Sequence, residues 1–302
     1  MIVVTGATGT VGRLVVDGLI AAGQPVRAMT RAPERAGLPP GVEVVAGDLD
    51  RPDSLLAAFR GAEKIFLLSA PGPASPAQDG RAATVAREAG VSYVVKLSAL
   101  GADTATEDPI GRWHLSGERA VAKSGLAYTF LRPNGFMTNA LRWARSIREE
   151  GTVSVPFARA PSAVIDPADI AAVALVVLSD ASDLHDGKAY PLTGPEALSA
   201  ADQVAALADA LSWPIKVIDV PPEIARDRMV AAGMAPDIAD ALMARGRAGT
   251  PYDPSVHQTV ERLVGRPARS YKQWVADHVN CFRSPHTSSP ADCQLGQHRH
   301  SH

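Results

Sequence analysis

The chain has 302 residues, of which 46% are hydrophobic and 21% charged, and its formal net charge is −2. This balance is typical of a globular protein with one large or two smaller cores. A charge so close to zero argues against an electrostatic grip on nucleic acid or on an anionic membrane. No apolar run is long enough to cross a bilayer, and the apolar start lacks the charged region of a signal peptide. The sequence therefore predicts a cytoplasmic protein.

Three glycines, Gly6, Gly9 and Gly12, follow a β-branched run at residues 2–4 and are spaced three apart. Behind them, residues 11–20 place apolar side chains on one face of a helix. The order predicted is therefore strand, tight glycine turn, helix. Such a turn brings backbone N–H groups and a helix N-terminus up to a diphosphate. This segment predicts a dinucleotide-binding site.

The rest of the first half alternates between strands and helices. Strands are predicted at residues 24–30, 42–46, 64–68, 91–97 and 127–131, and helices at 54–59, 78–89 and 110–123. Nearly continuous apolar strands separated by helices indicate a parallel sheet covered on both faces. We expect a doubly wound α/β (Rossmann) fold, with its ligand outside the carboxyl ends of the strands.

Past residue 135 the pattern changes to a smaller lobe interleaved with the sheet. Helices are predicted at residues 136–149, 167–178, 199–211 and twice within 222–245, with strands near 153, at 189–192 and at 215–218. The predicted domains are an NADP-binding Rossmann domain at 1–150 and a substrate lobe at 151–281. Residues 282–302 are rich in Ser, Pro, His and Gln and are predicted to be a disordered tail. The spacing of the tail histidines matches no zinc pattern, so no metal site is predicted.

Arg31 stands at the end of the second predicted strand. Dinucleotide-binding folds place an acidic residue there when they bind the ribose 2′-hydroxyl of NAD(H). No Asp or Glu ends this strand, and Glu34 comes later, between two arginines. An arginine in this place suits a 2′-phosphate, so the predicted cofactor is NADP(H).

The helix predicted at residues 110–123 carries His114 and Glu118 one turn apart on one face. In a Tyr-x-x-x-Lys pair, the lysine lowers the pKa of the tyrosine so that it protonates a developing alkoxide. No tyrosine of this chain has a lysine four residues later. Two interpretations of His114 stay open: it donates a hydrogen bond or a proton to the reduced substrate, or it simply pairs with Glu118.

Several motifs together resemble the NmrA-like atypical short-chain dehydrogenases/reductases, most of all their type-2 NAD(P)H:quinone oxidoreductases. They are Gly-Ala-Thr-Gly-Thr-Val-Gly at 6–12, Arg31, His114-x-x-x-Glu118, and the runs at 124–133 and 164–171. The resemblance covers about residues 1–280. It implies diphosphate binding by Gly6, Thr8, Gly9, Thr10, Val11 and Gly12, 2′-phosphate binding by Arg31, and adenine binding by Asp48 and Leu49.

The same resemblance implies a cofactor lining made by Ser69, Ala70, Pro71, Leu97, Ser98 and Pro133. It implies a substrate pocket at Asn134, Gly135, Phe136 and Met137, with Pro133 and the first three of these beside the nicotinamide. For Asp48, a role as a turn or capping residue is an equally open interpretation.

A quinone accepts hydride on a strongly electrophilic ring, and the resulting delocalised anion takes its proton from water. A site that only positions cofactor and substrate therefore suffices. The function predicted is NADPH-dependent hydride transfer to a quinone or a conjugated aromatic carbonyl. Two alternatives remain: a non-catalytic NADP(H)-binding redox sensor, and an accessory reductase in aromatic polyketide biosynthesis. The sequence predicts no oligomeric state.

Overall fold

The computed structural model describes residues 1–70, 72–104, 108–249 and 254–283. Its centre is a seven-stranded parallel sheet with the strand order β3-β2-β1-β4-β5-β6-β8. The strands are β1 (Ile2–Val4), β2 (Val26–Thr30), β3 (Glu43–Ala46), β4 (Lys64–Leu67), β5 (Tyr93–Leu97), β6 (Ala127–Pro133) and β8 (Lys188–Leu192). The predicted doubly wound parallel sheet is confirmed.

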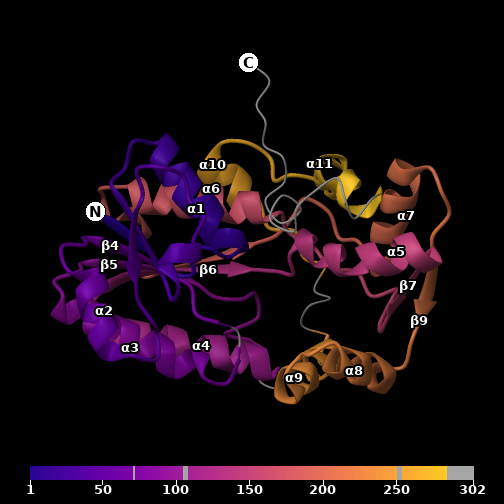
Figure 1. The fold of residues 1–302 in the computed structure, drawn as a ribbon, viewed down its shortest axis with the longest axis horizontal. Helices are drawn as coiled ribbons and strands as arrows, with labels where there is room; N and C mark the ends of the chain where they lie inside the picture. The colour runs from indigo at the N-terminus through magenta and orange to yellow at the C-terminus, as the bar shows by residue number, and fades with distance from the viewer. Residues whose placement is uncertain (71, 105–107, 250–253, 284–302) are drawn as a thin grey trace.

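Helices cover both faces of this sheet (Figure 1). One layer holds α1 (Thr10–Ala21), α6 (Pro167–Ser179) and α10 (Thr259–Val264), and the other holds α2 (Pro52–Phe59), α3 (Ser75–Glu88) and α4 (Pro109–Lys123). Two separate hydrophobic cores form between these layers and the sheet. Burial on both faces explains why the central strands are almost entirely apolar.

A smaller lobe lies beyond the end of β6, at the right of Figure 1. It contains a two-stranded parallel sheet of β7 (Thr152–Val155) and β9 (Lys216–Asp219). Its helices are α5 (Ala144–Glu150), α7 (Ala200–Leu211), α8 (Pro222–Ala231), α9 (Pro236–Arg247) and α11 (Tyr271–Arg283). Its main core includes Trp274 and Phe282, and α8 and α9 enclose a second, smaller core.

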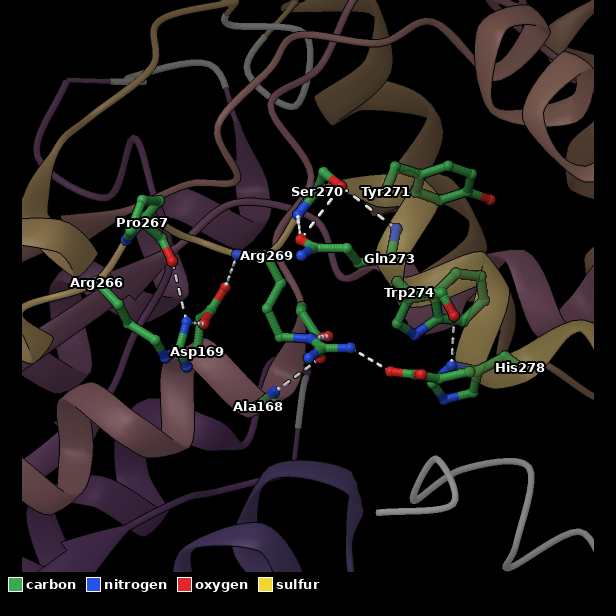
Figure 2. A network of polar contacts seen from close by, with 12 residues as sticks. Ala168, Asp169, Arg266, Pro267, Arg269, Ser270, Tyr271, Gln273, Trp274 and His278 are labelled. Carbon is green, nitrogen blue, oxygen red and sulfur yellow. Dashed lines mark hydrogen bonds and ion pairs between the residues drawn. The ribbon is translucent and has the colours of Figure 1, made fainter. Parts of the chain in front are cut away.

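A polar network, shown in Figure 2, joins the sheet domain to the smaller lobe. Asp166 caps α6 by accepting the N–H of Ala168 at 2.9 Å, as expected of a carboxylate just before the proline at a helix start. The second carboxylate oxygen of Asp166 accepts from Arg269 at 2.8 Å, and Arg269 also pairs with Asp277 of α11. One arginine thus connects α6 to α11.

The structure differs from the predicted elements at several places. The single helix predicted at residues 136–149 is a β-bridge from Phe136 to Ile165, followed by the 3₁₀ helix η2 (Met137–Trp143) and then α5. The helices α10 and α11 were not predicted. Two further short 3₁₀ helices are η1 (Pro33–Arg35) and η3 (Asp183–His185).

The predicted tail at 282–302 lies mostly outside the described residues. Residues 282 and 283 complete α11, and Phe282 is buried because its ring packs into the core of the smaller lobe. None of the helices in the described ranges is both long enough and apolar enough to span a membrane.

Candidate functional site

The carboxyl ends of the central strands form the edge at which the predicted site residues gather. From β1 the chain runs outward through β2 and β3 on one side, and through β4, β5 and β6 on the other. This reversal between β1 and β4 is a topological switch point, where doubly wound folds bind their ligands. Thr5 holds the two strand ends together, because its hydroxyl accepts from the N–H of Leu68 at 2.7 Å and donates to the Leu68 carbonyl at 3.0 Å.

The glycine turn follows β1 directly. Gly6 has a φ of 60°, which favours glycine, and a Cβ at Gly12 would lie only 2.1 Å from the Gly6 carbonyl oxygen. Gly9 is the N-cap of α1 and supplies no side-chain cap, and the first turn of α1 holds no acidic residue. The first N–H groups of α1 therefore remain available for an anion. This cradle fits the diphosphate of a dinucleotide.

Arg31 follows β2 and is exposed. Within the described ranges, its guanidinium has no hydrogen bond or ion pair. Arg13 of α1 donates to the carbonyl oxygens of Ala36 at 2.8 Å and Gly37 at 2.6 Å, which holds the loop after Arg31 against α1. An unpaired guanidinium next to a loop that is held in place is suited to bind a phosphate.

Asp48, after β3, forms a turn. Its carboxylate accepts the N–H of Asp50 at 3.0 Å, while its own N–H donates to the hydroxyl of Ser54 at 3.0 Å. The interpretation of Asp48 as a turn residue is therefore confirmed, and contact with an adenine stays a prediction for it and for the half-buried Leu49.

The loops after β4 and β5 carry the remaining residues that the sequence predicts to line the cofactor. Ser69 and Leu97 are half-buried and Ala70 is exposed, while Pro71 lies outside the described residues. Ser98 is buried, and its hydroxyl donates to Glu118 at 2.6 Å. The Ser98 hydroxyl is thus already used within the protein.

Glu118, on α4, is bound by an arginine rather than by a histidine. Arg132 of β6 donates to both Glu118 oxygens, from Nε at 2.9 Å and from Nη2 at 2.7 Å, and a third nitrogen pairs with Asp103. The hydrogen bonds to Glu118 raise the pKa of Arg132. The interpretation of His114 as the partner of Glu118 is wrong, because Ser98 and Arg132 already occupy this carboxylate.

His114 is half-buried on α4, and its Nδ1 atom is fully buried. No hydrogen-bond partner for Nδ1 exists in the part of the chain that the structure describes. Burial, with the positive charges of Lys96 and Arg245, lowers the pKa of His114 to about 3. The imidazole is therefore neutral at neutral pH, and only one of its nitrogens carries a hydrogen.

Two buried ion pairs near His114 were not predicted. Lys96 of β5 pairs with Asp79 of α3 at 2.6 Å, and Arg245 of α9 pairs with Asp108, the N-cap of α4. Arg245 also donates to the Leu100 carbonyl at 3.1 Å. The sequence feature that could have indicated the first pair is Lys96 itself, a lysine within an otherwise apolar central strand. A fully buried lysine almost always has a partner of opposite charge.

The predicted substrate-pocket residues follow β6. Pro133, Asn134 and Met137 are buried, and Gly135 and Phe136 are half-buried. The Asn134 side-chain oxygen accepts the N–H of Gly135 at 2.8 Å, which sets the orientation of the amide. Its Nδ2 atom is buried and has no acceptor among the described residues. Asn134 therefore retains two unused N–H donors at the carboxyl end of the sheet.

The sequence profile of an NAD(P)H-binding family matches residues 6–181, which include the glycine cradle, Arg31 and α4. The chain belongs to this family, within its NmrA-like group. It is an oxidoreductase that binds NAD(P)H. The glycine turn fits this cofactor: a Cβ at Gly6 or Gly12 would clash with Leu68 or with the turn's own backbone, and at Gly9 the only atom of the described residues within 4 Å of an added Cβ is the Gly6 carbonyl oxygen, so the space outside Gly9 is open.

Two relatives match nearly the whole chain. A (4-alkanoyl-5-oxo-2,5-dihydrofuran-3-yl)methyl phosphate reductase from Streptomyces griseus is 41% identical over 93% of this chain and 99% of its own. An NAD(P)H azoreductase from Xenophilus azovorans is 37% identical over the same shares. A solved NADPH-dependent quinone oxidoreductase from Escherichia coli, in complex with NADPH, is 27% identical, with a TM-score of 0.80 over 91% of this chain and 99% of its own.

Proposed function

We propose that this protein transfers hydride from NADPH to a quinone or to another conjugated, electron-poor acceptor. The observation that carries the proposal is that the chain has no Tyr-x-x-x-Lys pair, while buried polar atoms of His114 and Asn134 have no partner among the described residues. Burial lowers the pKa of His114, which agrees with a neutral imidazole at neutral pH. An isolated ketone needs a strong proton donor for its alkoxide. A conjugated acceptor spreads the negative charge and takes its proton from water.

The names of the relatives support the same class of acceptor. They describe the reduction of an oxo-dihydrofuran, of azo compounds and of quinones. In each case the group that accepts hydride is part of a conjugated system. The three substrates share this electronic property and little of their shape. We therefore infer that the site selects its substrates by how electrophilic the acceptor group is and by where that group lies relative to the nicotinamide.

Each proposed site residue has a separate role in this reaction. The glycine turn and the N-terminus of α1 bind the diphosphate, and Arg31 binds the 2′-phosphate. NADPH, when bound, supplies the hydride. Pro133, Asn134 and the residues up to Met137 flank the acceptor. The unused Asn134 N–H groups and the neutral imidazole of His114 donate hydrogen bonds to the acceptor oxygen as negative charge develops on it.

The test measures NADPH oxidation with a benzoquinone and with a simple ketone. We expect the quinone to be reduced at least about 100 times faster than the ketone, because the site offers no strong proton donor for the alkoxide that a ketone forms. His114→Ala should slow the quinone reaction by less than the roughly 100- to 10,000-fold that loss of a general acid costs. The exposed ion-paired Arg145 provides a control variant, Arg145→Ala.

Two results would contradict the proposal. A near-complete loss of quinone turnover in His114→Ala would make His114 the proton donor. Tight NADPH binding without turnover of any quinone, azo compound or enone would favour the redox-sensor alternative instead.

A further inference from the structure

The helices α8 and α9 of the smaller lobe have no role in the reaction proposed above. They enclose a small core of their own around Val220, Ala225 and Met243, apart from the main core of the lobe. At the surface, Arg226 of α8 pairs with Asp240 of α9 at 2.9 Å. The two helices therefore form a compact unit, and its place in the molecule depends on the contacts that fasten it to the rest.

Arg245 fastens α9 to the sheet domain. Its buried guanidinium donates to the Asp108 carboxylate and, from a second nitrogen, to the Leu100 carbonyl oxygen 3.1 Å away. Asp108 is fully buried and is the N-cap of α4, where its other carboxylate oxygen accepts the N–H of Ile110 at 2.9 Å. Over the residues that the structure describes, every polar contact from α9 to the sheet domain comes from this one arginine.

The loops that α9 contacts follow β4 and β5 at the carboxyl edge of the sheet. Leu100 follows β5, and its N–H donates at 2.9 Å to the carbonyl oxygen of Pro133, at the end of β6. Gly72 follows β4, and a Cβ there would lie 3.2 Å from Cδ1 of Ile238 on α9. Figure 1 shows α9 next to α4. The helix therefore lies at the edge to which the nicotinamide and the acceptor are assigned.

α9 is held between α4 and the loop after β7. On the α4 side, the charge of Arg245 contributes, after burial and Lys96, to the low pKa of His114. On the other side, a Cβ at Gly246 would lie 2.6 Å from the ring of Phe157. Phe157 has a φ of 56°, a costly conformation for a bulky residue that persists only where the surrounding structure enforces it. The position of α9 is thus closely defined on both sides.

A buried ion pair is a poor way to gain stability. Removing two charges from water costs free energy that their attraction at best roughly offsets, and apolar side chains of similar volume often hold a fold as firmly. Hydrogen bonds from a guanidinium are directional, however. Two of them, to Leu100 and Asp108, set both the distance and the orientation of α9. The contribution of Arg245 is therefore to geometry more than to stability.

We propose that Arg245 is a positioning residue, which docks α9 on Asp108 and Leu100 so that α9 forms the outer wall of the acceptor site. Because Asp108 neutralises Arg245 and Ile238 lies beside the loop after β4, this wall suits an uncharged conjugated ring. It also keeps water from the side of the acceptor that faces the smaller lobe. The role toward the acceptor rests on the proposed function, whereas the docking of α9 does not.

The test uses variants of the full chain. Arg245→Met with Asp108→Asn removes both charges, and asparagine still caps α4. Arg245→Met alone leaves a buried carboxylate unpaired, and Arg245→Lys keeps the charge but not the two-pronged contact. Arg226→Met is the matched control, because it removes an arginine–aspartate pair within the α8–α9 unit and leaves the contacts with the sheet domain in place.

Two measurements are made on the enzyme with NADP⁺ bound. Hydrogen–deuterium exchange, followed by mass spectrometry, reports how firmly α9 is docked. Calorimetric titration with tetramethylbenzoquinone reports binding alone, since NADP⁺ has no hydride to transfer. KM and kcat for the same quinone are then measured with NADPH, and the affinity for NADPH is measured by fluorescence.

In the double variant we expect amide exchange in α9 to be at least about tenfold faster. The dissociation constant and the KM of the quinone should rise about tenfold with little change in kcat, because the wall contacts the acceptor both before and during hydride transfer. NADPH affinity should stay unchanged. Arg245→Met should act in the same direction, Arg245→Lys should lie between the wild type and the double variant, and Arg226→Met should match the wild type.

Unchanged exchange of α9 in the double variant would overturn the docking role of Arg245. Faster exchange with unchanged quinone affinity and KM would overturn the wall, as would an equal loss of NADPH affinity, which indicates a general disturbance of the site. Failure of the proposed function looks different. Weaker quinone binding by the double variant, in an enzyme that transfers hydride to no acceptor, would refute the reductase assignment and still support the role of Arg245.

Discussion

Arg31 is the single side chain on which the choice between NADPH and NADH should depend most. It is exposed after β2, with a guanidinium that is unpaired within the described ranges, while Arg13 fastens the following loop. We expect Arg31→Ala to weaken NADPH binding about tenfold, or about 1.4 kcal/mol, and to leave NADH binding unchanged. Fluorescence titration with both cofactors measures this.

Arg35→Ala is the control for this prediction. Arg35 lies on the same loop and is 86% exposed, with Glu34 at 3.8 Å, so its charge is partly offset and strongly hydrated. It should change the preference for NADPH less than Arg31→Ala does. Equal affinities for the two cofactors in the wild type would contradict the role of Arg31.

The residues of the site differ in how far the sequence could predict them. The three glycines and Arg31 depend on local backbone geometry and on their place after a strand, so their pattern is readable in one segment. The state of His114 depends on Lys96 and Arg245, which come from β5 and α9. No local pattern reports a charge brought close by tertiary packing. The pairing of His114 with Glu118, one of two interpretations left open, fails because Ser98 and Arg132 bind Glu118 from other elements, and a role of His114 toward the substrate stays a prediction.

At the level of elements, the turn from β1 to α1 distinguishes two glycines that look equivalent in the sequence. Gly9 has a φ of −85° and a ψ of 175°, which any residue adopts, and a Cβ there would lie 3.3 Å from the Gly6 carbonyl oxygen. Gly12 has no such room, with 2.1 Å to the same oxygen. We expect Gly9→Val to fold normally and to lose NADPH binding, because its side chain occupies the diphosphate space.

Gly12→Ala should instead disrupt the turn itself and lower the thermal unfolding midpoint together with NADPH affinity. Circular dichroism melting and cofactor titration of both variants separate the two effects. Normal NADPH binding by Gly9→Val would show that this turn does not hold the diphosphate.

The helix α10 and the segment 136–149 escaped correct prediction for different physical reasons. The helix α10 has six residues and ends at Gly265, with Pro267 soon after, so its apolar period is too short to recognise. Residues 136–149 have helical periodicity, yet Phe136 is drawn into a bridge with Ile165. The strands of the main sheet were predictable because burial on both faces makes them continuous apolar runs.

On the scale of the whole molecule, the chain crosses between its two lobes several times. After the smaller lobe begins, α6 returns to cover the sheet beside α1, and β8 extends the sheet beyond β6. The boundary proposed at residue 150 therefore marks a change in architecture and does not separate two independent chain segments. Contacts between the lobes should govern whether they unfold together.

The final prediction concerns the contact in Figure 2 that joins the lobes through Arg269. Arg269→Met removes the guanidinium bonds to Asp166, the N-cap of α6, and to Asp277 of α11, and it retains the backbone N–H that donates to Asp169 at 2.7 Å. Hydrogen bonds between charged groups contribute about 1.5–3 kcal/mol, so we expect the free energy of unfolding to fall by about 2 kcal/mol. Urea unfolding followed by circular dichroism measures the change. Arg145→Met, which breaks an exposed pair with Glu149, should change the unfolding midpoint far less, because water and salt screen that pair. Equal midpoints for the two variants would show that the Arg269 guanidinium contributes no more to stability than an exposed ion pair does.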